Sequence, residues 1–267
     1  MTEATSRRPE HAPVILEARQ LERTFPSGTR AFRGLSFDVR EGEIVGVVGT
    51  SGCGKSTLLR VISGFDRGEG SITLHGQEIR GLSPRVGLVF QEPRLMPWLS
   101  IRRNVAFGLA TKRVPVVERE RRVSHWLDAV GLSGFAGHYP KECSGGMAQR
   151  AALARCLATQ PEILLLDEPF SALDAFTRMQ LQDLLLGIHA ETRATLVLVT
   201  HDIDEALYLC DRVLVLRGQP GVLARELAVG PSRPRQRGDA ELGRLKDRIL
   251  EVLDLRSPQA AQPEYSL

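Results

Sequence analysis

Residues 49–57 read Gly49-Thr50-Ser51-Gly52-Cys53-Gly54-Lys55-Ser56-Thr57 and match the pattern G-x-x-x-x-G-K-[ST] in full. The apolar run at residues 44–48 predicts a buried strand before them, and residues 56–62 predict a helix after them. Glycines let the backbone approach phosphates with its N–H groups turned inward, and the helix start adds a positive end. The stretch therefore predicts an α/β fold with a phosphate-binding loop, in which Lys55 reaches the β- and γ-phosphates of ATP and Ser56 binds Mg²⁺.

The composition sets broad limits on the class of protein. Of the 267 residues, 42% are hydrophobic and 25% are charged, as in ordinary globular proteins. The net charge of +3 is too small to indicate nucleic acid as a partner. Arginines gather at positions 119, 121 and 122 and at 233, 235 and 237, and we expect both clusters to lie on a solvated surface.

Neither a signal sequence nor a membrane span is visible in the sequence. Residues 1–13 have no apolar core, and we expect them to form a disordered polar tail. No apolar run approaches the length needed to cross a bilayer. The four cysteines form no C-x-x-C pair, which favours free thiols in a reducing compartment. We therefore expect a cytoplasmic protein that docks onto a membrane partner if it acts at a membrane.

The rest of the chain predicts an α/β core interrupted by helices. Short strands with glycine-rich turns are expected over residues 14–81, and residues 86–90 predict another strand. Helical periodicity then dominates residues 91–142. Apolar runs at 163–167 and 195–200, with a helix over 177–189 between them, predict a parallel sheet with helices on both faces.

Polar side chains follow three of the predicted strands. Asp167 and Glu168 end the apolar run at 163–167, Gln91 follows residues 86–90, and His201 follows residues 195–200. Ligand sites of α/β sheets lie at the carboxyl ends of the strands. We expect Asp167 to hold the Mg²⁺ shell, Glu168 to polarise the attacking water, and Gln91 and His201 to contact the γ-phosphate or Mg²⁺.

A second glycine-rich segment precedes another predicted helix. Residues 143–150 read Cys143-Ser144-Gly145-Gly146-Met147-Ala148-Gln149-Arg150. Ser144 and the two glycines form a helix start that suits an anion, although a simple helix cap is the better explanation of this segment taken by itself. Because one nucleotide cannot easily use two such loops of one monomer, we expect a dimer in which this loop covers the ATP bound by the other copy.

These motifs together resemble the ATP-binding subunits of ABC transporters. The resemblance rests on residues 49–57, Gln91, residues 144–150, residues 164–168, Ser171-Ala172-Leu173-Asp174 and His201, and it covers about residues 14–217. It implies a P-loop ATPase core with an N-terminal antiparallel β subdomain and an inserted α-helical subdomain. It also implies that Phe25 stacks on adenine, with a core aromatic as the alternative, and that Asp174 lies at the dimer interface.

The resemblance further implies partners and a location. The expected assembly is a head-to-tail homodimer with ATP between the copies, docked on two membrane-spanning permease subunits at the cytoplasmic face of the inner membrane. A periplasmic or extracellular solute-binding protein takes part indirectly. One departure from the family pattern is Cys143, where the family usually has Leu, and its small apolar side chain can keep the packing role.

Finer features resemble the nitrate, sulfonate and taurine importer branch. They are residues 91–98 with Asn104 and Val105, residues 170–175 with Arg178, and residues 204–207. The segment Pro231-Ser232-Arg233-Pro234-Arg235 resembles the tail of aliphatic-sulfonate ATPases. The predicted function is ATP hydrolysis that drives import of aliphatic sulfonates, with nitrate, taurine or a pyrimidine precursor as alternative solutes.

Two other functions are compatible with a phosphate loop. A soluble non-transport ABC ATPase usually carries long coiled coils or two motor domains, which this chain lacks. A P-loop kinase would need neither the Ser144 segment nor Asp174. The expected domains are a tail at 1–13, an ATPase domain at 14–230 with its helical insert at about 91–158, and a C-terminal extension at 231–267.

Overall fold

The apolar run before the glycine-rich loop forms a central strand of a six-stranded sheet. In the computed structural model, which describes residues 12–110, 112 and 114–254, the strand order is β10-β9-β3-β8-β7-β6. The strands are β3 (Ile44–Gly49), β6 (Val86–Val89), β7 (Ile163–Asp167), β8 (Thr195–Val199), β9 (Arg212–Arg217) and β10 (Val222–Ala228). All neighbours pair in parallel except β10, which is antiparallel to β9. The predicted parallel sheet is confirmed, whereas the sequence patterns above did not predict β9 and β10.

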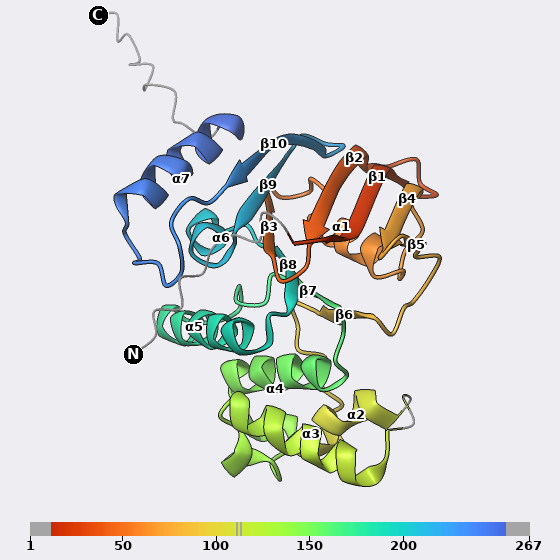
Figure 1. Cartoon of the computed structure of the whole chain (residues 1–267), viewed down its shortest axis with the longest axis vertical. Coiled ribbons are helices and arrows are strands. Elements are labelled where there is room, and N and C mark those ends of the chain that lie inside the picture. Colours follow the sequence, from red (N-terminus) through yellow and green to blue (C-terminus); the bar gives the residue numbers. More distant parts are fainter. Residues whose placement is uncertain (1–11, 111, 113, 255–267) are drawn as a thin grey trace, which may run out of the picture.

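A second sheet is antiparallel and comes from the N-terminal part of the chain. Its order is β2-β1-β4-β5, with β1 (Val14–Thr24), β2 (Arg30–Arg40), β4 (Glu69–Leu74) and β5 (Gln77–Glu78). Figure 1 shows it beside the larger sheet, with α1 (Lys55–Ile62) next to it. The predicted antiparallel subdomain is confirmed, although β1 and β2 are longer than the short strands expected.

Three of the remaining helices form a separate helical part at the lower end of the molecule in Figure 1. They are α2 (Ile101–Ala110), α3 (Val116–Ala129) and α4 (Gly145–Ala158), joined by 3-10 turns at Ser133–Phe135 and Pro140–Glu142. The other helices are α5 (Ala175–Thr192), α6 (Ile203–Leu209) and α7 (Ala240–Val252). The predicted helical insert between two parts of the α/β core is therefore confirmed.

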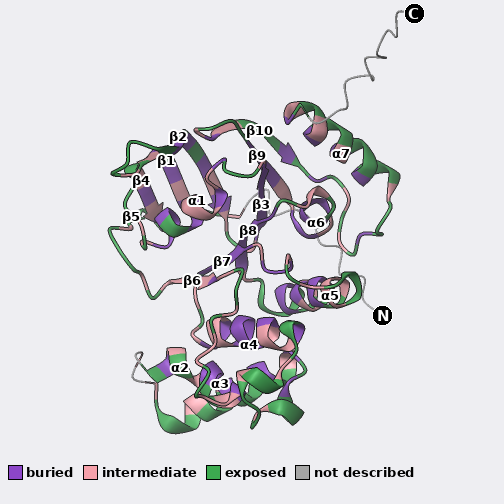
Figure 2. Cartoon of the chain, turned by 180° about the vertical axis from the view of Figure 1, so that it is seen from behind, coloured by how far each residue is buried: buried purple, intermediate pink, exposed green. Residues whose placement is uncertain are grey.

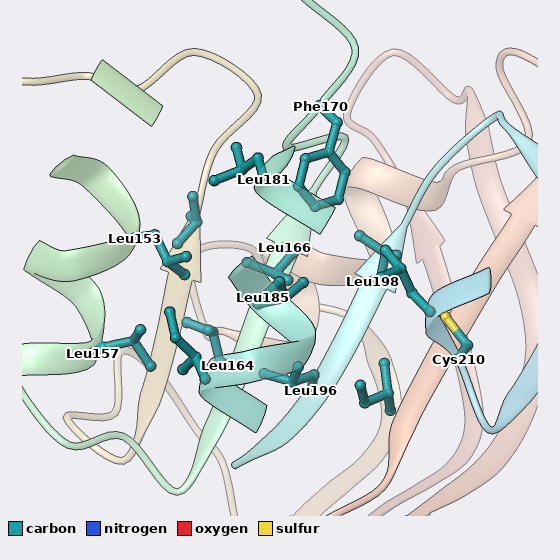
Figure 3. Close-up of a cluster of buried hydrophobic side chains, with 14 of the residues drawn as sticks. Leu153, Leu157, Leu164, Leu166, Phe170, Leu181, Leu185, Leu196, Leu198 and Cys210 are labelled. Carbon is teal, nitrogen blue, oxygen red and sulfur yellow. The ribbon is translucent and has the colours of Figure 1, made fainter. Parts of the chain in front are cut away.

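The two faces of the larger sheet bury different partners. Because side chains alternate along a strand, Leu164 and Leu166 of β7 face α4 and α5, while Ile163 and Leu165 face α1 and the antiparallel sheet. Figure 3 shows the first face, where leucines of β7 and β8 meet those of α4 and α5. Figure 2 shows β7 and β8 mainly in the colour of buried residues, while the helices beside them also carry intermediate and exposed residues. This burial fixes the carboxyl ends of β3, β7 and β8, from which the candidate site is built.

One cluster of arginines lies only partly on a solvated surface: Arg237 is exposed as predicted, whereas Arg233 is half-buried and Arg235 is buried. Arg235 is only 6% exposed, and its guanidinium donates to the carbonyls of Leu207, Tyr208 and Cys210 at the end of α6. Arg233 pairs with Asp211. For Arg235 the prediction was wrong because the last carbonyls of a helix need donors. The segment after β10 supplies such a donor to α6, although the two are separated in the sequence. The other cluster stays at the surface, with Arg121 and Arg122 paired to Glu118.

Within the described residues, no helix has both the length and the apolar character needed to cross a bilayer. Residues 1–11 of the predicted tail at 1–13 lie outside the described residues, and so does the end of the chain at 255–267.

Candidate active site

The loop after β3 wraps tightly because two of its glycines leave no room for a side chain. A Cβ on Gly49 would lie 2.4 Å from the Leu216 carbonyl oxygen of β9, and one on Gly54 would lie 2.7 Å from the Ala31 carbonyl oxygen of β2. Gly54 also has a φ of 88° and forms the N-cap of α1. The loop is therefore shaped by strands on both sides, and it delivers the start of α1 to the sheet edge.

Lys55 is buried at the first turn of α1 and points back across this loop. Its Nζ donates to the carbonyl oxygens of Gly49 at 2.9 Å and Thr50 at 3.1 Å. These carbonyls satisfy two donors of an ammonium that is only 7% exposed. The lysine charge is thus held inside the curve of the loop, where it can meet an anion.

Ser56 and Asp167 come together from α1 and the end of β7. The Ser56 hydroxyl donates to Oδ1 of Asp167 over 2.8 Å. Burial raises the pKa of the Asp167 carboxyl above its ordinary value, while the hydrogen bond from Ser56 acts in the opposite direction. The pair places a hydroxyl and a carboxylate, both hard oxygen ligands, beside the loop.

Glu168 follows in a strained backbone conformation. Its φ is 44°, in the left-handed region that non-glycine residues rarely adopt. The Glu168 N–H donates to the Val199 carbonyl at 2.9 Å, and the Glu168 carbonyl accepts from the Ser171 hydroxyl at 3.0 Å. Its Oε2 lies 3.0 Å from Nδ1 of His201. Such strain persists where the surroundings fix it, often at functional sites, and here it turns the carboxylate towards His201.

A cavity of about 510 Å³ is lined by Lys55, Ser56, Glu168 and His201, whereas Gly49, Thr50, Cys53 and Asp167 are not part of its wall as the described residues form it. Its walls include nine of the predicted site residues, namely Phe25, Ser51, Gly52, Gly54, Lys55, Ser56, Thr57, Glu168 and His201. The Phe25 ring also has the Arg23 guanidinium carbon 4.8 Å from its centroid. Phe25 thus lies at the wall of the cavity, half-buried against the core beside it.

Four cavity residues were missed, namely Thr29, Arg30, Ala31 and Gln219. The Gln219 side chain donates to the Ser51 carbonyl at 3.1 Å and lies over Gly52. A signal for it existed, because an apolar run at 213–216 is followed by Gly218 and Pro220, which is typical of a turn after a strand. The other three come from β2 and the loop before it, and no local pattern marks them.

Gln91 is exposed and takes no part in that cavity wall as the described residues form it. Its Nε2 donates to the Ser171 hydroxyl over 3.1 Å. Since the Ser171 hydroxyl also donates to the backbone carbonyl of Glu168, one intermediate side chain connects Gln91 to the backbone of Glu168.

The Ser144 segment lies elsewhere. Ser144 caps α4 by accepting the Met147 N–H at 3.3 Å, and it is exposed together with Gly145. Among the described residues, neither these nor Gly146 and Asp174 lie in the wall of the cavity. Asp174 caps α5 by accepting the N–H groups of Phe176 and Thr177, and the contacts with Thr177 lower the pKa of its carboxyl. Both segments are exposed helix starts in this monomer.

The chain is similar to known proteins of one family in sequence and in fold. Residues 32–171 match the family described as ABC transporter. An aliphatic sulfonates import ATP-binding protein of Burkholderia cenocepacia (strain HI2424) is 49% identical over 94% of this chain and 91% of its own length. A protein of the same description from Bacillus thuringiensis subsp. konkukian is 43% identical over 82% of this chain and 87% of its own length.

Solved structures agree with the fold. A dimeric ATP-binding cassette bound to ADP and Pi in a post-hydrolysis state has a TM-score of 0.72 at 32% identity, covering 81% of this chain and all of the other. The protein cbiO1 of Clostridium perfringens, part of an ABC transporter complex, has a TM-score of 0.73 at 27% identity, covering 92% of this chain and 96% of the other.

The chain therefore belongs to the ABC transporter family, as an ATP-binding, ATP-hydrolysing subunit. Within the family it is similar to ATP-binding proteins of aliphatic sulfonate import.

Proposed function

We propose that this chain is the ATP-hydrolysing motor of an importer for aliphatic sulfonates. The observation that carries the catalytic part is one cavity in which the loop with Lys55 faces Glu168 and His201. The relatives named for sulfonate import, 43% to 54% identical, support the solute class. The proposed place of action is the cytoplasmic face of the inner membrane, where the chain is attached as a peripheral subunit.

The oxygen ligands present fit magnesium. Ser56 and Asp167 adjoin at 2.8 Å beside the loop, and Gln91 can add an amide oxygen. No cluster of three or more His, Cys, Asp or Glu that could hold a metal occurs within residues 12–110, 112 and 114–254. That agrees with Mg²⁺, which is usually bound by one or two protein groups together with phosphates. When bound, the ion would neutralise charge on the phosphates.

The proposed roles of the side chains are compatible with their positions. The loop amides, the start of α1 and Lys55 bind the phosphates, and Phe25 lies where it can stack on the base. Glu168 orients the attacking water and accepts its proton. His201, bonded to Glu168, holds the carboxylate and the γ-phosphate in register.

We also propose that the helix start at Ser144, Gly145 and Gly146, of which Ser144 and Gly145 are exposed, completes the site of a second copy. Two copies arranged head to tail would enclose two ATP molecules, with Asp174 at their interface. The dimeric cassette structure supports this arrangement. Two membrane-spanning permease subunits would carry the motors, as cbiO1 is part of a transporter complex, and a solute-binding protein outside the membrane would deliver the sulfonate.

Glu168→Gln tests the catalytic part and the solute together. We expect the purified variant to bind MgATP normally and to hydrolyse it about 100-fold more slowly or worse, because the proton acceptor is lost. A strain without this chain should grow on an aliphatic sulfonate as sole sulfur source when given the wild type, but not when given the variant.

Two outcomes would contradict the proposal. Wild-type hydrolysis by Glu168→Gln would remove Glu168 from the chemistry. Normal growth of the deletion strain on sulfonates, with a defect on another solute, would overturn the sulfonate assignment alone.

A further inference from the structure

The loop that carries Asp174 is tied to the Ser144 segment. Asp174 caps α5, so the loop and the first turn of this helix form one unit. A Cβ on Gly145 would lie 3.6 Å from Leu173, and one on Gly146 would lie 2.5 Å from Cγ2 of Thr177. The start of α5 therefore packs directly against the segment proposed to serve the other copy's nucleotide.

The loop that carries His201 is braced on both sides of the histidine. The Thr200 hydroxyl donates to Oε2 of the buried Glu205 at 2.8 Å, and the Asp202 N–H donates to that hydroxyl's oxygen at 3.0 Å. Asp202 in turn caps α6 by accepting the Glu205 N–H at 3.1 Å. A displacement of Asp202 is therefore expected to move the backbone of the adjacent His201.

The Arg178 side chain spans these two loops. Its NH1 donates to Oδ2 of Asp202 and its NH2 to the carbonyl of Leu173, each over 3.3 Å. The guanidinium is planar, so the two donors keep a fixed relation to each other. The Arg178 and Asp202 side chains are half-buried, with exposed fractions of 33% and 31%. Solvent therefore screens this ion pair only in part.

We propose that Arg178 is a positioning residue that couples the loop of Asp174 to the loop of His201. A displacement of the Ser144 segment by the second copy would pass through Leu173 and Arg178 to Asp202 and His201. The copy that closes one nucleotide site would thereby set the histidine of its own site. This inference rests on the proposed roles of His201 and the Ser144 segment.

Arg178→Met and Asp202→Asn test the coupling in the full-length chain. Asparagine caps a helix as well as aspartate does, so Asp202→Asn removes the bridge and keeps the start of α6. We expect each variant to bind MgATP normally and to lower kcat by about 10- to 100-fold, the effect of a small misplacement of a reacting group. The Hill coefficient for MgATP should fall towards one, and the double variant should be no worse than either single variant.

Lys246→Met is the matched control. Lys246 of α7 pairs with Asp204 of α6 at 2.6 Å. It lines the same cavity beside α6 as Arg178. Among the described contacts it bonds to neither of the two loops. It should leave both kcat and the Hill coefficient unchanged. Arg178→Lys, which keeps the charge but lacks the fork, should fall between the wild type and Arg178→Met.

The outcomes separate the coupling from the proposed function. Wild-type kcat in Arg178→Met, multiplicative losses in the double variant, or an equal loss in Lys246→Met would overturn the coupling. If Arg178→Met melts at a much lower temperature, Asp202→Asn and Arg178→Lys decide by the same criteria. Glu168→Gln assayed alongside tests the site itself, since its failure to stop hydrolysis would refute the proposed function whatever Arg178 does.

Discussion

Two glycine-rich segments open helices in this chain, residues 49–54 before α1 and residues 144–146 at α4, and they meet different surroundings. The first is enclosed by β2 and β9, and the buried Lys55 lies across it. The second is exposed at Ser144 and Gly145, and its hydroxyl only caps its own helix. Both have amides suited to an anion, but only the first has walls and a cation within one monomer.

The difference shows that a helix start is half of a binding site. An anion at residues 49–54 finds Lys55 and a cavity formed by neighbouring strands. An anion at residues 144–146 would find solvent on its other side. A second copy that supplies the missing walls would make the two segments equivalent in function, and three experiments test that reading.

The largest expected effect is that of Ser144→Arg. Arginine would fill the space proposed for the other copy's γ-phosphate, so turnover should fall about 100-fold, while the monomer binds ATP as before. The lost cap should lower the free energy of unfolding by only about 1 kcal/mol. Steady-state hydrolysis and nucleotide titration of the same sample check both points.

Asp239→Arg controls for the loss of a cap. Asp239 caps α7 by accepting the Glu241 N–H at 2.7 Å, away from both glycine-rich segments. This variant should have a slightly lower melting temperature and hydrolyse ATP at the wild-type rate. Full turnover in Ser144→Arg would refute the shared site and favour a plain helix cap.

A smaller effect should distinguish the glycines of the two segments. Gly54→Ala forces a φ of 88° on alanine and puts its Cβ 2.7 Å from the Ala31 carbonyl oxygen, so it should lower the free energy of unfolding by roughly 1–3 kcal/mol. Gly145→Ala meets only Leu173 at 3.6 Å, so its melting temperature should not change. If Gly145 faces the other copy's phosphate, that variant should nevertheless hydrolyse ATP more slowly. Equal melting temperatures for the two variants would contradict the difference in surroundings.

The smallest effect concerns Cys143, beside the second segment. Its thiol is half-buried and donates to the Tyr139 carbonyl, whereas Cys53 in the first loop is fully buried. Partial burial raises the pKa of the Cys143 thiol, so alkylation should quicken as pH rises and more thiolate forms. Cys143 should react before Cys53, and MgATP should slow its labelling several-fold in Glu168→Gln. Peptide mass spectrometry measures this, and labelling that ignores MgATP would argue against coverage by a second copy.

Prediction from sequence succeeded where the determinants are close together along the chain. The strand before residue 49, the helix after it, and the carboxylates at the end of β7 are contiguous patterns, and the structure confirms these elements. The parallel sheet followed because alternating strands and helices admit few arrangements. The roles assigned to the side chains there stay predictions.

Prediction failed where a distant segment completes a surface. Arg235 looked like part of a solvated cluster because nothing near it in sequence shows that it reaches the carbonyls of Leu207 and Cys210. Gln219 follows a strand and turn that the sequence does indicate, but nothing near it shows that it contacts the Ser51 carbonyl, which lies 168 positions away. The partners of such donors depend on which distant segments the fold brings together, and local periodicity in the sequence does not contain that information.

The sequence by itself determined that this chain has a phosphate-binding loop with a lysine at a helix start. The nine contiguous residues 49–57 contain the glycines, the charged Lys55 and the hydroxyl of Ser56. Only the tertiary structure decided which residues enclose that loop and that Arg178 bridges Leu173 and Asp202. Those contacts arise because parallel strands bring the ends of distant segments to one edge of the sheet, so their partners depend on strand order.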